Sequence, residues 1–136
     1  MIQNSTRSLA YLFARLPIAL SFVGHGLVRL PKLEKFSQWM VGLFQKSMLP
    51  VELVQPFSYA LPFLELTIGL LLLVGLFTRQ AIIAGSLVML VLIFGSSMLE
   101  EWQNVFLQML YGLYFAGLLL FVEEYNQYAL DSKWRR

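Results

Sequence analysis

The sequence predicts an all-α integral membrane protein: a four-helix antiparallel bundle with an interfacial amphipathic segment between its first two spans. Hydrophobic residues make up 58% of the chain and charged residues only 13%, which is far from the balance of a soluble domain. Four stretches are also long and apolar enough to cross a bilayer, which takes about 20 residues at a rise of about 1.5 Å each. We place these spans at about 8–30, 56–77, 80–99 and 103–122, within a single domain of residues 1–136.

The first span, 8–30, is interrupted by Arg15 and Pro17, and no small-residue cleavage site follows it. These features are not those of a secretory signal peptide, so we expect it to remain as a span. Arg15 leaves three alternatives open. Its side chain either snorkels to the N-terminal interface, reaches inward to pair with Glu65, or holds an anionic group near the "TRQ" turn at 78–80.

The connection 31–55 begins at Pro31 and mixes large apolar side chains such as Trp39 and Phe44 with Lys and Gln. This mixture is typical of a short amphipathic helix in the membrane interface, although a structured loop explains it equally well. The other links, "TRQ" at 78–80 and "EEW" at 100–102, are short and force consecutive spans to be antiparallel. The tail 123–136 is polar, with aromatic residues suited to the headgroup zone.

Basic residues at the ends of the spans predict the orientation. Five lie on the side of the termini and four on the side of the long connection. The first group is Arg7, Arg79, Lys133, Arg135 and Arg136, and the second is Arg29, Lys32, Lys35 and Lys46. Because basic residues are enriched in the cytoplasm, this count favours cytoplasmic termini.

Composition also excludes several classes of function. The chain has no cysteine, so disulfides, thiolate metal sites and redox CxxC chemistry are excluded. The net charge of +2 is distributed over the ends of the spans, which gives no support to a nucleic-acid partner. We expect the lipid bilayer as the main surroundings, no metal site and no covalently bound cofactor.

Polar residues from all four spans fall in one half of the predicted bundle. His25 lies roughly 7 Å below the face of the long connection, and Glu65 roughly 13 Å below the same face. Helical side chains lean toward their own N-terminus, so these two lean toward each other. Near this level lie the end of the third span and the start of the fourth, which contribute Ser96, Ser97, Asn104, Gln108 and Tyr111.

These residues predict a pocket with His25 and Glu65 as candidate catalytic residues. The candidate ligand-binding residues are Arg15, Ser96, Ser97, Gln108 and Tyr111. These residues also have purely structural explanations. A lone membrane histidine is equally well explained by a hydrogen bond to an interior carbonyl, and serine and glutamine commonly join helices in lipid. A carboxylate near mid-membrane costs about 3 kcal/mol or more, so Glu65 needs a partner, a cavity or a pathway.

Two motifs carry a resemblance to a known family. "GHGLVRL" in the first span and "PFLELTIGLLLLVGLFTR" at 62–79 resemble the DoxX family of small four-helix bacterial membrane proteins. The positions that match the family's pattern are Arg15, His25, Gly26, Leu30, Pro62, Glu65, Gly69, Gly75, Thr78 and Arg79. Arg29 stands where the family usually has lysine, which keeps the charge but changes the geometry.

The resemblance implies a protein of the bacterial inner membrane. Some family members accompany thiosulfate:quinone oxidoreductases, and others accompany sulfur or redox-stress proteins. The first hypothesis is therefore a membrane subunit of an oxidoreductase or envelope complex, whose His25/Glu65 pocket binds a quinone-like or small polar ligand. Histidine can donate to a quinone carbonyl and pass a proton, while Glu65 holds its tautomer or relays the proton. With one histidine and no cysteine, the chain cannot build a bis-histidine haem or an iron–sulfur cluster, so a partner would supply electrons.

The second hypothesis is a non-enzymatic scaffold that binds a partner protein or another copy of the chain. In this case His25 and Glu65 only lock the bundle, and the loop face with Trp39 and Trp102 is the important surface. A small transporter is a weaker third, because four short spans leave little room for alternating access.

Overall fold

The computed structural model describes residues 2–134, and that part of the chain is helical without strands. Its elements are α1 (Ile2–Arg29), the 3₁₀ turn η1 (Leu30–Lys32), α2 (Leu33–Phe44), α3 (Val51–Val74), α4 (Thr78–Met98), α5 (Trp102–Tyr125) and α6 (Asp131–Trp134). Four segments are long and apolar enough to span a membrane. The predicted fold class is therefore confirmed, and the chain is a multi-pass membrane protein.

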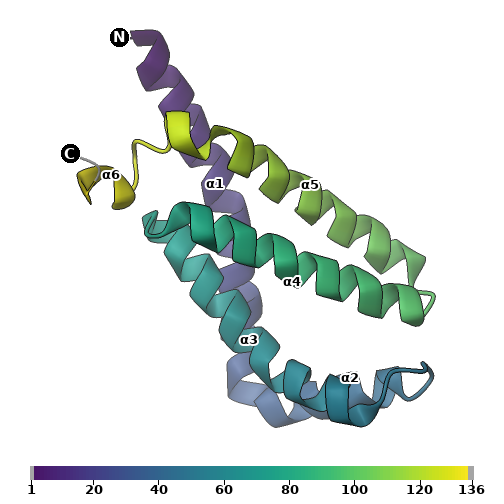
Figure 1. The fold of residues 1–136 in the computed structure, drawn as a ribbon. Coiled ribbons are helices and arrows are strands. Elements are labelled where there is room, and N and C mark those ends of the chain that lie inside the picture. Colours follow the sequence, from purple (N-terminus) through teal and green to yellow (C-terminus); the bar gives the residue numbers. More distant parts are fainter. Residues whose placement is uncertain (1, 135–136) are drawn as a thin grey trace.

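The long helices form two closely packed pairs (Figure 1). Helix α3 runs antiparallel to α1, and α5 runs antiparallel to α4 in a hairpin. Helices α3 and α4 meet at the turn Gly75–Phe77 and then diverge, so the bundle opens toward its other end (Figure 1). Helix α2 packs against the N-terminal half of α3 at this open end.

Glycines allow the backbones of α1 and α3 to touch. A Cβ placed on Gly69 would lie 2.6 Å from the backbone nitrogen of Val23, and one placed on Gly26 would lie 2.6 Å from Cβ of Leu66. Small residues permit such close approach in lipid, where van der Waals packing drives helix association. This crossing fixes the depth of the residues that α1 and α3 direct at each other.

Helix α5 completes the core through aromatic side chains. Phe115 is fully buried and packs edge-on against Phe22 of α1, with ring centroids 5.3 Å apart. The tip of the Phe115 ring fills the space over Gly85 of α4, where an added Cβ would lie 2.5 Å from Cζ of the ring. Tyr11 of α1 donates a hydrogen bond of 2.8 Å to the Leu118 carbonyl. These contacts hold α5 onto the α1 side of the bundle.

The helix predicted within 31–55 is α2, which continues from α1 through η1. A buried hydrogen bond of 2.6 Å joins Ser37 of α2 to Ser58 of α3, and Tyr59 donates to Glu34 at 2.8 Å. Helix α3 starts at Val51 and not near 56, because Pro50 precedes its first turn in an extended conformation. The segment is thus a helix attached to α3 and not a loose connection.

The turn between the second and third spans lies earlier than the sequence suggested. The "TRQ" segment forms the first turn of α4, and the turn itself is Gly75–Phe77. Gly75 ends α3 in the left-handed region with φ of 72°, and its N–H donates to the Leu71 carbonyl at 2.9 Å. Glycine is the residue that adopts this C-terminal cap without strain.

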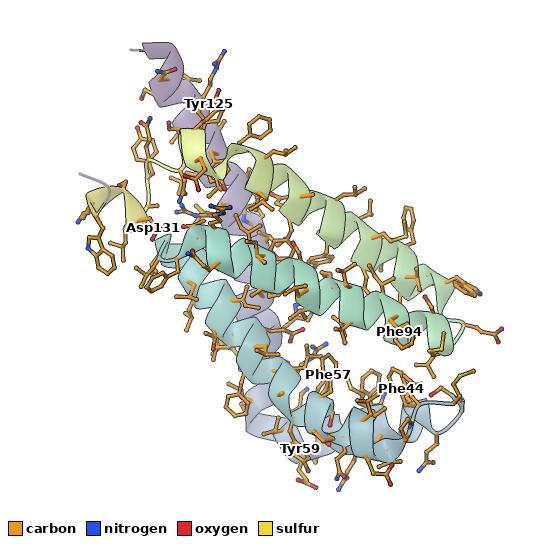
Figure 2. The ribbon with its side chains drawn as sticks, in the orientation of Figure 1. Phe44, Phe57, Tyr59, Phe94, Tyr125 and Asp131 are labelled. Carbon is orange, nitrogen blue, oxygen red and sulfur yellow. The ribbon has the colours of Figure 1, made fainter. Side chains whose placement is uncertain are left out.

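The polar tail folds back onto this turn. The Asp131 carboxylate accepts hydrogen bonds from the backbone N–H groups of Phe77 at 2.7 Å and Thr78 at 2.8 Å, and so caps α4. The backbone N–H of Asp131 in turn donates to the Gly75 carbonyl at 3.0 Å, and Figure 2 shows Asp131 beside the start of α4. Arg135 and Arg136, which entered the orientation count, lie outside the described residues.

Candidate functional site

A cavity of about 490 Å³ occupies the open end of the bundle, between the α2/α3 side and the α4/α5 hairpin. Its walls are mostly apolar. Figure 2 shows Phe44 and Phe57 on one side of this space and Phe94 on the other. The polar members of the lining are His25, Arg29, Glu65, Ser96, Asn104, Gln108 and Tyr111. An apolar cavity with a few convergent polar groups is the usual form of a small-ligand site.

An ion pair forms one wall of this cavity. Nη1 of Arg29 donates to both carboxylate oxygens of Glu65, at 3.0 Å to Oε1 and 2.8 Å to Oε2. The guanidinium also lies over the Phe36 ring, with Cζ 4.6 Å from the ring centroid. Glu65 comes from the middle of α3 and Arg29 from the last turn of α1, so the close α1–α3 crossing brings them together.

Arg29 keeps donors that the ion pair does not use. A guanidinium carries five N–H groups, and Nη1 accounts for two of them. Among the described residues, no acceptor is seen for the groups on Nε and Nη2, and the side chain retains 26% of its exposure. Glu65 and Phe36 therefore fix the orientation of a cation that can still bind an oxygen atom of a ligand in the cavity.

His25 lines the same cavity, one helical turn before Arg29. Its Nδ1 lies 2.7 Å from the Ser21 carbonyl oxygen. Because a carbonyl only accepts hydrogen bonds, Nδ1 carries the hydrogen, and Nε2 is the nitrogen available to a ligand. The sequence expectation that Glu65 holds the histidine tautomer is therefore wrong: the Ser21 carbonyl does so, and Glu65 binds Arg29.

The other predicted residues at this level divide into two groups. Tyr111 and Ser96 line the cavity, and the Tyr111 hydroxyl shares a hydrogen bond of 2.8 Å with Ser21. Gln108 also lines it, and its Oε1 is buried without a hydrogen-bond partner among the described residues. Ser97 does not line the cavity. Its hydroxyl donates a hydrogen bond of 2.7 Å to the Ile93 carbonyl of its own helix.

Arg15 lies at the opposite end of the bundle. It is 1% exposed, so it does not snorkel to the interface. Its guanidinium donates to Oδ1 of Asn126 and, at 2.9 Å, to the Tyr128 carbonyl. The Asn126 amide continues to the Thr78 hydroxyl at 2.9 Å. The alternatives of snorkelling and of pairing with Glu65 are both wrong, because Arg15 binds the tail and, through Asn126, is connected to Thr78 at the start of α4.

Arg29 is the charged cavity residue that sequence reasoning left out of the candidate site, because it was counted as a charge of the loop side. Two signals were present. Arg29 lies four residues after His25, which places both on one face of a helix, and Glu65 at its depth requires a cation.

Within residues 2–134 no group of three His, Asp or Glu side chains is close enough to hold a metal ion.

Comparison with known proteins agrees with the motifs. The family model named DoxX matches residues 10–97, which include the cavity residues of α1, α2 and α3 and the Arg29–Glu65 pair. No curated protein and no solved structure gives a significant match. The matched region is more than half of the chain and covers all or most of three of the four spans, so the chain belongs to the DoxX family.

Proposed function

We propose that this DoxX-family protein binds a small ligand with a carbonyl-bearing head, of the quinone class, in the cavity at the open end of the bundle. In this role it is a membrane subunit of an oxidoreductase or envelope complex. One observation carries the proposal: Arg29 is fixed by Glu65 and Phe36 while its Nε and Nη2 donors have no acceptor among the described residues. A carbonyl oxygen is the complementary partner for such donors.

The cavity walls suit an amphiphilic ligand that arrives from the bilayer. Several lining residues are themselves about half exposed, including Leu53 at 59%, Phe94 at 55% and Leu107 at 48%. In a membrane protein these side chains face lipid, so the cavity is accessible from the hydrocarbon region. An apolar ring and tail would lie between α2 and α4, with the polar head toward Arg29.

The residues divide the chemistry among them. Arg29 donates to a carbonyl oxygen and stabilises the negative charge that develops there on reduction. His25, with Nδ1 fixed on the Ser21 carbonyl, presents Nε2 for proton transfer. A bound quinone would take up two electrons, supplied by a partner protein, and two protons on becoming a quinol. His25 would pass protons to it by taking each one up on Nε2 from water before giving it to a carbonyl oxygen.

Ion pairs leave the expected orientation unchanged. Arg29 bonds Glu65, and Arg79 on the side of the termini lies 3.9 Å from Glu123. The orientation rule counts Lys and Arg whether or not they are paired, so the count of five basic residues on the side of the termini against four on the loop side is unchanged and supports cytoplasmic termini. A reporter fused to the C-terminus tests it: a periplasm-active phosphatase should stay inactive there, and an active one would contradict the orientation.

Quinone binding can be measured through Trp39, which lines the cavity. In a variant with Trp102→Phe and Trp134→Phe, decylubiquinone should quench the remaining fluorescence with a saturable dependence. Arg29→Gln should weaken this binding at least tenfold, which is about 1.4 kcal/mol, and Arg29→Lys should weaken it less. Lys35→Gln, an exposed basic residue of α2, is the matched control. Equal quenching in all variants would contradict the proposal.

A partner-binding role remains the second candidate, and exposed tryptophans favour it. Trp39 is 58% exposed and Trp102 is 62% exposed, both at the end of the bundle that carries α2. Trp102→Ala should then reduce recovery of a partner protein, or of a second copy, after crosslinking in native membranes. Glu65→Gln separates the two roles. Normal accumulation with lost quinone binding supports the site, and loss of the protein supports a structural lock.

A further inference from the structure

A second concave surface lies in the other half of the bundle, between the N-terminal half of α1 and the C-terminal half of α5. We call it the α1–α5 groove. It is an open groove of about 610 Å³, lined by residues of both helices that include Arg7, Tyr11, Leu113, Tyr114, Gly117 and Phe121. None of these residues lines the cavity described above.

The groove has a rigid floor and open walls. Two tyrosine hydroxyls bridge the helices, from Tyr11 to the Leu118 carbonyl at 2.8 Å and from Tyr114 to the Ala14 carbonyl. Leu113 and Phe121 at the walls are 69% and 50% exposed. Because these bridges set the separation of α1 and α5, the groove is a built feature of the fold, and its exposed apolar walls face lipid.

One end of the groove carries a positive charge. Nη1 of Arg7 donates to the Tyr125 hydroxyl at 3.2 Å, and the guanidinium lies 5.9 Å from the centroid of that ring. Figure 2 shows Tyr125 beside the first turns of α1. Of the five N–H groups of Arg7, four have no acceptor among the described residues. A guanidinium held in this way is suited to a bidentate contact with a phosphate.

We propose that the α1–α5 groove binds one phospholipid molecule, with an acyl chain against its floor and the phosphate on Arg7. The dimensions agree with this occupant. Leu113 to Phe121 spans roughly 12 Å along α5, which approaches half of the roughly 30 Å hydrocarbon thickness of a bilayer. Arg7 lies beyond the end of this apolar stretch, at the level where a headgroup begins. This proposal is independent of the quinone site.

Glycines of α5 offer a matched test. A Cβ on Gly117 would meet no atom within 4 Å, although Gly117 lines the groove. Gly112 is equally free of contacts and lies outside both concave surfaces. Gly117→Leu therefore fills the groove without disturbing the fold, and Gly112→Leu makes the same substitution where it blocks nothing.

The measurement is native mass spectrometry of the full chain released from mixed micelles that contain dioleoyl phosphatidylglycerol. We expect one retained lipid per chain, with the bound fraction reduced at least fivefold by Gly117→Leu and by Arg7→Gln but unchanged by Gly112→Leu. Dioleoylglycerol lacks the phosphate. The parent protein should therefore retain it no better than Arg7→Gln retains dioleoyl phosphatidylglycerol.

Three outcomes would overturn the proposal. Equal retention in all variants would mean that the lipid is annular only. Loss in Arg7→Gln alone would mean a surface phosphate contact without an acyl groove, and loss in Gly117→Leu alone would mean an apolar groove that does not recognise phosphate.

Discussion

Removing the Glu65 carboxylate tests whether the ion pair supports the open end of the bundle. At the 2.8 Å separation of Nη1 and Oε2, an effective dielectric constant of about 20 gives an attraction of about 6 kcal/mol, of which desolvation cancels a part. Loss of one partner from a buried pair costs about 3–5 kcal/mol. Because Arg29 is 26% exposed, we expect Glu65→Ala to lower the free energy of unfolding by about 3 kcal/mol, at the lower end of that range.

The assay is reversible unfolding by SDS in mixed micelles, followed by the loss of helical ellipticity. Glu52→Ala is the control, because it removes an exposed carboxylate from the first turn of the same helix. It should cost less than about 1 kcal/mol. The double variant Glu65→Ala with Arg29→Met should recover at least half of the loss, since no charge is then left unpaired. A Glu65→Ala variant as stable as Glu52→Ala would refute the reasoning.

Three further predictions concern the packing. Gly69→Leu should lower the free energy of unfolding by more than about 2 kcal/mol, because the side chain meets the Val23 backbone. At Gly24 an added Cβ meets no atom within 4 Å, so Gly24→Leu should leave the stability nearly unchanged. Equal stability of the two variants would contradict the α1–α3 crossing. Asp131→Ala should cost about 1 kcal/mol and speed hydrogen exchange at the Thr78 amide, and unchanged exchange would exclude the cap. Ser37→Ala should cost about 1 kcal/mol in SDS unfolding, whereas full stability would show that the bond to α3 is dispensable.

The number and type of the helices could be predicted because they depend on local properties. An apolar stretch of about 20 residues has few structural options in lipid, so four spans and their antiparallel order followed from hydropathy and short links. The position of a turn was less certain. Thr78 belongs to α4 because the Asp131 carboxylate caps that helix, and this contact comes from a residue 53 positions away in the chain.

The depth of the site residues in the membrane could be predicted from the sequence, but which side chains bond to each other could not. Depth along a helix is local, and it placed His25 and Glu65 near the same cavity. Rotation about the helix axis depends on packing, and the crossing at Gly26 and Gly69 turns Arg29 toward Glu65. The partners of Arg15 were beyond such reasoning, since Asn126 lies 111 residues later and no local pattern connects the two.

The most direct test of the central claim is to identify what stays bound to the protein. The intact chain is purified from native membranes in mild detergent, and the small molecules and proteins that accompany it are measured by mass spectrometry. The account predicts a quinone-class molecule that is retained by the parent protein, reduced in His25→Ala and Arg29→Gln, and unaffected by Gly117→Leu, which lies in the other groove. A protein partner recovered without any such molecule, or a quinone retained equally by every variant, would contradict it.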